Sequence, residues 1–104
     1  MTLPKAKKSK PVEKPKSLWT FLSNHTHVLI SIYRDSEMTV KDMASLVGIT
    51  ERAVLSILQD LEREGYLVRE KTGRRNRYKV VEKVFLRHPL ESHKTIGDLL
   101  KLLK

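Results

Sequence analysis

The sequence predicts an α+β fold that is mainly α-helical with one small β-hairpin, and three observations predict it. First, residues 51–64 carry apolar side chains at the spacing of one buried helical face: Val54, Ile57, Leu58 and Leu61. Second, two short strand-like runs, 67–71 and 77–81, flank a turn that contains Gly73. Third, the chain has 104 residues, which is enough for one small core and too few for two.

Residues 1–17 are predicted to form a disordered basic arm. They hold six lysines against one acid, Glu13, together with three prolines and few apolar side chains. Such a composition buries too little apolar surface to offset the entropy lost on ordering. The chain has a formal net charge of +9, concentrated in this arm and in the hairpin. Focused positive charge is typical of proteins that bind nucleic acid or an anionic membrane, although it also keeps a surface soluble.

The ordered domain is expected to span residues 18–81. A first helix over 25–34, with Asn24 as its N-cap, is predicted from apolar residues on one helical face: Val28, Leu29, Ile32 and Tyr33. Residues 38–40 are expected to add a very short strand. A second helix is predicted over 41–47, because its apolar residues also recur at helical spacing.

A glycine separates the second helix from the third. Gly48 is expected to end the second helix, because glycine enters the left-handed region without steric cost. Thr50 is a suitable N-cap for the third helix, and Gly65 a suitable stop. A short helix, a glycine turn and a second helix with a buried face form the helix-turn-helix pattern. With the hairpin that follows, the predicted fold is a winged helix-turn-helix.

Two segments resemble a known class of proteins: MTVKDMASLVGITERAVLSILQDLEREGYLVRE and GRRNRYKV. They are similar to winged helix-turn-helix transcriptional regulators of the broad MarR and ArsR type, over about residues 23–81. The tail, LRHPLESHKTIGDLLKLL, looks like that of small prokaryotic regulators with the same wing. The resemblance implies a sequence-specific regulator that binds double-stranded DNA. The alternatives are a winged helix that binds a partner protein within a larger assembly, and a non-specific nucleoid or RNA-binding protein.

The third helix is expected to enter the major groove of DNA. Arg52 can bond guanine O6 and N7 in a bidentate manner, and Gln59 can bond adenine N6 and N7. The predicted base-reading residues are Thr50, Glu51, Arg52, Leu55, Ser56 and Gln59. The alternative is an ordinary amphipathic helix whose polar face is solvated.

The hairpin is expected to meet DNA phosphates or a narrow minor groove. Its predicted contact residues are Lys71, Arg74, Arg75, Asn76, Arg77 and Lys79. Asn76 is also expected to shape the turn, since asparagine tolerates left-handed geometry, and Tyr78 and Val80 are expected to face the core. The alternative is an edge hairpin whose charges prevent aggregation.

Several classes of function are not supported by the sequence. There is no cysteine, and the four histidines lack metal-ligand spacing, so neither a metal nor another cofactor is expected. No phosphate-cradling glycine loop or hydrolase motif appears, so the protein is not expected to be an enzyme. No apolar run reaches the roughly 20 residues of a membrane span. The expected location is cytoplasmic, on the nucleoid, with no sizeable pocket for a small-molecule effector.

Residues 82–104 are predicted to form a loop around Pro89 and a short C-terminal helix. Large apolar residues cluster at both ends of the domain, and an exposed cluster of this size normally marks an interface. A homodimer is therefore expected, held by Trp19, Phe21, Leu22, Leu99, Leu100 and Leu103. The alternative is that the C-terminal helix covers Trp19 within its own chain.

Overall fold

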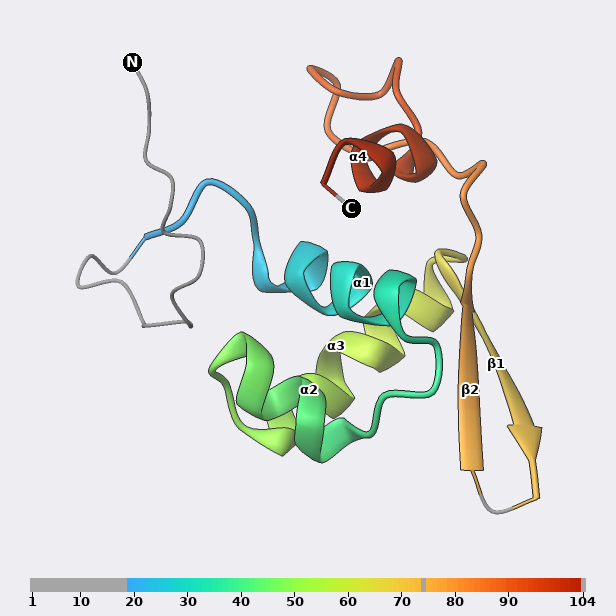
Figure 1. The fold of residues 1–104 in the computed structure, drawn as a ribbon. Coiled ribbons are helices and arrows are strands. Elements are labelled where there is room, and N and C mark those ends of the chain that lie inside the picture. Colours follow the sequence, from blue (N-terminus) through green and yellow to red (C-terminus); the bar gives the residue numbers. More distant parts are fainter. Residues whose placement is uncertain (1–18, 74, 104) are drawn as a thin grey trace.

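The computed structural model describes residues 19–73 and 75–103, so the predicted basic arm over residues 1–17 lies outside the described part. Within that part the chain has four helices and one hairpin (Figure 1). The elements are, in order, α1 (Asn24–Arg34), α2 (Val40–Val47), α3 (Glu51–Arg63), β1 (Leu67–Thr72), β2 (Arg75–Val80) and α4 (Ile96–Leu103). Three helices followed by a two-stranded antiparallel hairpin confirm the predicted winged helix-turn-helix.

One hydrophobic core joins the helices and the hairpin. Its largest fully buried side chains come from α1, α2, α3 and α4: Val28, Ile32, Met43, Val54 and Leu100. Tyr66 at the start of the hairpin and Tyr78 on β2 complete the core with under 10% of their surface exposed. Figure 1 shows α4 above α1, while α2 lies below α1 and the hairpin extends away to one side. The predicted inward direction of Tyr78 is confirmed.

Two predictions for the residues just before α1 and α2 are wrong: the N-cap of the first helix and the short strand before the second. Ser23, and not Asn24, caps α1, because the Ser23 hydroxyl accepts the backbone N–H of Thr26 at 3.3 Å. The Asn24 side chain instead hydrogen-bonds the His27 ring at 3.0 Å. The predicted strand at residues 38–40 is also wrong, since Thr39 caps α2 by accepting the N–H of Asp42 at 3.0 Å. A side chain that caps a helix offers the backbone an alternative to strand pairing.

The turn between α2 and α3 follows the prediction. Gly48 has a φ of 87°, and the N–H groups of Gly48 and Ile49 both donate to the carbonyl of Ala44, at 2.8 and 3.1 Å. Both bonds go to one carbonyl in the last turn of α2, and a left-handed residue after the helix brings the second N–H back to it. Thr50 then caps α3 by accepting the N–H of Ala53 at 3.0 Å.

The hairpin pairs Leu67 with Val80 at its base and ends in a two-residue turn. Gly73 occupies that turn with a φ of 65°, which a residue with a β-carbon rarely adopts. The predicted turn role of Asn76 is wrong: it lies inside β2, opposite Lys71, and no described non-glycine residue has a positive φ. The left-handed residue of the turn is Gly73, and Asn76 is therefore not needed in that role.

The C-terminal segment packs against the same core. Ile96 and Leu100 of α4 are 5% and 1% exposed, and the segment before α4 is tied to its start by the bond from Ile96 N–H to the Val84 carbonyl. Gly97 lies against the loop, because a β-carbon there would sit 2.8 Å from Glu82 Cβ and 3.0 Å from its carbonyl oxygen. The glycine therefore permits the close approach of α4 to residue 82.

The side chains predicted to form a dimer interface fall into three groups. Leu100 belongs to the core of its own chain and has no surface to offer a second copy. Leu22, Leu99 and Leu103 are partly buried. Trp19 and Phe21 are 65% and 90% exposed, so α4 does not cover Trp19 as the alternative proposed.

Candidate nucleic-acid interface

The exposed face of α3 carries the central residues of the predicted base-reading set. Burial of Val54, Ile57, Leu58 and Leu61 fixes the rotation of α3 in the domain. Arg52, Ser56 and Gln59 are spaced i, i+4 and i+7, which places them on one stripe of the opposite face, and all three are exposed. The packing of α3 on the core therefore leaves a guanidinium, a hydroxyl and a primary amide in a row on the exposed face of this helix.

The other predicted base-reading residues differ in how far their side chains are exposed and free to bond DNA. Glu51 is exposed in the first turn of α3, where a carboxylate complements the helix dipole. Leu55 is 49% exposed and flanks the polar stripe. Thr50 is exposed, and its oxygen accepts the N–H of Ala53, so its hydroxyl proton and one lone pair remain for a base or phosphate.

The carboxylates in the C-terminal half of α3 are engaged within the chain. Asp60 bonds His25 Nε2 at 2.9 Å and Arg63 Nη2 at 2.8 Å, and the hydrogen bond from His25 is the first cause that lowers the pKa of Asp60 below 3.8. Glu62 lies 3.3 Å from Arg69 of β1. These acids therefore have cationic partners, and the pair of Glu62 with Arg69 links α3 to the hairpin.

The hairpin exposes most of the predicted cationic residues. Lys71, Asn76, Arg77 and Lys79 are exposed, Arg75 belongs to β2, and Arg74 lies outside the described residues. Directly opposed residues share a face of a hairpin. Lys79 and Arg77 therefore share one face with their partners Val68 and Glu70, and Asn76 shares the other with Lys71. The cations are divided between both faces.

Arg77 has a partner that the sequence did not indicate. Its Nη2 lies 3.3 Å from Glu37 Oε2, on the loop between α1 and α2. That loop is held against β2, because the N–H of Tyr78 donates to the Ser36 carbonyl at 3.1 Å. Both side chains are about half exposed, and an exposed ion pair is weak, so Arg77 can exchange Glu37 for another anion.

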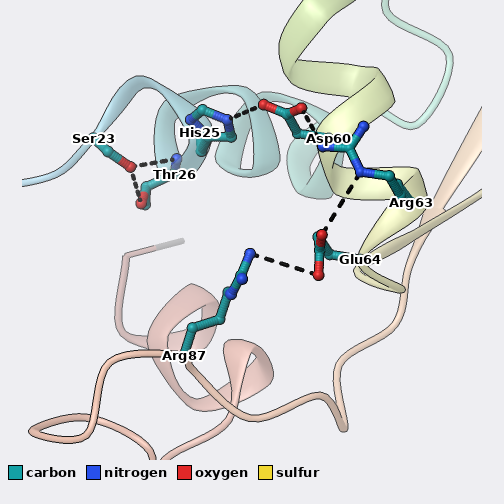
Figure 2. A network of polar contacts seen from close by, with 7 residues as sticks. All are labelled: Ser23, His25, Thr26, Asp60, Arg63, Glu64 and Arg87. Atoms are coloured by element: carbon teal, nitrogen blue, oxygen red, sulfur yellow. Dashed lines mark hydrogen bonds and ion pairs between the residues drawn. The ribbon is translucent and has the colours of Figure 1, made fainter.

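A groove lies at the other end of α3, and it corrects the expectation of no sizeable pocket. Its volume is about 590 Å³, between the start of α1, the C-terminal half of α3 and the segment before α4. Figure 2 shows its polar rim, where Arg87 extends from the C-terminal segment toward Glu64 at the end of α3. The groove walls come from three segments that are far apart in sequence, and periodicity within one segment does not reveal such a space.

His25, His27 and His88 hydrogen-bond other residues of the same chain. His25 pairs with Asp60, and His88 Nδ1 accepts the N–H of Leu90 at 3.0 Å within its own loop. Across residues 19–73 and 75–103, no three histidines, cysteines or carboxylates come together as a set that could hold a metal ion.

No helix in the described part of the chain has both the length and the apolar character needed to cross a bilayer.

Comparison with known proteins agrees with this architecture. Residues 23–68, which include α1, α2, α3 and the start of β1, match the family described as winged helix-turn-helix DNA-binding. A search of curated proteins finds no match. Residues 23–68 are therefore similar to winged helix-turn-helix DNA-binding domains, and the order of helices and hairpin is that of the winged helix-turn-helix fold.

Proposed function

We propose that this protein is a sequence-specific transcriptional regulator that binds double-stranded DNA. The observation that carries the proposal is the stripe of Arg52, Ser56 and Gln59 on α3, beside a hairpin with exposed cations. The recognition helix of a helix-turn-helix lies in the major groove, with its N-terminal residues on the base edges. Arg52 is in the first turn of α3, so it is well placed for a guanine.

The hairpin supplies the contacts that do not read sequence. Lys71, Arg77 and Lys79 are exposed and cationic, and such residues fix a protein on the phosphate backbone. The carboxylates of Asp60 and Glu62 oppose this arrangement little, because each forms an ion pair with an arginine, Arg63 and Arg69 respectively. The resemblance to regulators of the MarR and ArsR type supports the same role in the cytoplasm, on the nucleoid.

Selection of bound duplexes from a random pool tests this function. We expect the full chain to enrich one short motif, because base-edge contacts discriminate among sequences. A duplex that binds without enrichment would instead support a nucleoid-coating or RNA-binding protein. Failure to bind duplex DNA would support the protein-interaction alternative, in which Leu55 at the edge of the polar stripe meets a partner.

We further propose that the regulator is a homodimer. Trp19 and Phe21 contact each other edge to face, with ring centroids 4.9 Å apart, and both remain largely exposed. Leu102 of α4 is 79% exposed. In Figure 1 the segment before α1 and α4 both lie above α1, away from α2. A second copy that covers these side chains would leave α3 free to read DNA, and two copies could read two half-sites.

Phe21→Asp with Leu102→Asp is expected to give a folded monomer in sedimentation equilibrium, with weaker operator binding than the wild type. The physical reason is that a buried unpaired carboxylate opposes association. Leu90→Asp is the matched control, because Leu90 is 81% exposed in the loop before α4 and lies outside the proposed interface. A wild-type protein that is monomeric at micromolar concentration contradicts the dimer.

A further inference from the structure

We propose that the groove at the C-terminal end of α3 binds a zwitterionic ligand with an apolar side chain, namely a large apolar α-amino acid. Its volume of about 590 Å³ lies in the range of small-molecule sites, about 300–1,000 Å³. The site is separate from the stripe on α3 and from the hairpin. The proposal therefore does not depend on how the protein binds DNA.

The floor of the groove is apolar. Leu29, Leu61 and Ile96 line it with at most 5% of their surface exposed, and Leu86 adds a partly buried side chain. Tyr66 also lines it, but its hydroxyl donates to the Phe85 carbonyl at 3.1 Å and is thereby satisfied. An aliphatic or aromatic side chain that rests on this floor gains the free energy of leaving water.

The rim of the groove carries charged side chains of both signs, and these side chains differ in how closely they approach partners within the chain. Each carboxylate oxygen of Asp60 has one close partner, at 2.8 and 2.9 Å. Glu64 has only loose pairs, 3.7 Å from Arg63 and 3.6 Å from Arg87, and neither is within hydrogen-bond distance (Figure 2). Arg87 therefore keeps its donors for a new acceptor, and Glu64 keeps its acceptors for a new donor.

This alternation of charge selects the ligand class. A guanidinium binds a carboxylate in a bidentate manner, and a carboxylate binds an ammonium. Arg87 and Glu64 are adjacent, so the two ligand charges must also be adjacent, as they are on the α-carbon of an amino acid. Glu91, an exposed carboxylate on the same rim, has no ion pair among the described residues and gives the ammonium a second acceptor. A simple anion would meet Glu64 and Glu91, and a simple cation would meet Arg63 and Arg87.

Thermal unfolding of the full chain with added L-leucine or L-phenylalanine tests the proposal. A ligand that binds only the folded state stabilises it, so Tm should rise by roughly 4–8 °C when the ligand exceeds its Kd about fivefold. N-acetyl-leucine lacks the ammonium and leucine methyl ester lacks the carboxylate. Neither should raise Tm comparably, because each leaves a charge of the rim unpaired.

Two variants test whether the amino acid binds in the groove or elsewhere on the surface. Arg87→Gln should raise the apparent Kd obtained from the dependence of Tm on ligand concentration by about tenfold, since one charge-assisted pair is lost. Lys101→Gln is the matched control, because it removes the same charge from an exposed position of α4 that does not line the groove, and it should respond like the wild type. Absence of a shift with either amino acid, equal shifts with all four compounds, or an unchanged shift in Arg87→Gln would overturn the proposal.

Discussion

Leu100→Ala is expected to lower the free energy of unfolding by about 2–5 kcal/mol, the range for removing a buried leucine side chain. Leu100 is 1% exposed and belongs to the one core, together with residues of α1, α2 and α3. Truncation removes apolar contacts and leaves a cavity, and both terms act against the folded state. Urea denaturation followed by circular dichroism measures the loss. Fluorescence is a poor reporter, because the single tryptophan, Trp19, is 65% exposed.

Leu102→Ala is the matched control for this prediction. It makes the same substitution in the same helix, so the change in helix propensity is shared, but Leu102 is 79% exposed. At protein concentrations low enough to dissociate the proposed dimer, Leu102 faces solvent, and we expect this variant to change the free energy of unfolding by less than about 0.5 kcal/mol. Equal losses in the two variants would show that α4 does not dock on the core in solution. A loss in Leu100→Ala that depended on protein concentration would place this leucine in an interface instead.

The sequence predicted the parts of the fold that depend on local rules. The buried face of α3 followed from the spacing of four apolar residues, and Gly48, Gly65 and Gly73 marked the three places in the described chain where φ is positive. The errors arose where neighbouring residues had similar local preferences. Ser23 and Asn24 are both good N-caps, and the order of their hydrogen bonds depends on the structure around them.

The parts of the site that join distant segments could not be predicted. Glu37 and Arg77 meet because the loop after α1 lies against β2, and His25 meets Asp60 because α1 crosses the end of α3. Neither pair has a spacing that a helix or strand would reveal. The groove could not be predicted for the same reason, since its walls come from distant segments. The burial of Leu100 could not be predicted either, because its apolar character did not show whether its own chain or a second copy would cover it.

Arg52→Ala and Gln59→Ala are each expected to cost about 1–3 kcal/mol of preference for the motif found by selection, while affinity for unrelated duplexes changes little. The reason is that a bidentate contact to a base edge is lost only where the correct base is present. Both residues lie on the exposed stripe of α3, and the side chain of neither forms a hydrogen bond or ion pair with another residue in the described part of the chain. Competition binding with the selected duplex and a scrambled duplex, at one fixed salt concentration, measures the preference.

Arg87→Ala is the control for Arg52→Ala, because it removes the same charge at the groove and not on the stripe of α3. It should weaken binding to both duplexes slightly and equally, as loss of a remote positive charge does. The control therefore separates base reading from general electrostatic attraction. Wild-type discrimination in both Arg52→Ala and Gln59→Ala would show that the exposed stripe of α3 does not read bases. The polar face would then be a solvated surface or a contact for a partner protein, and the function proposed for this domain would have to be replaced.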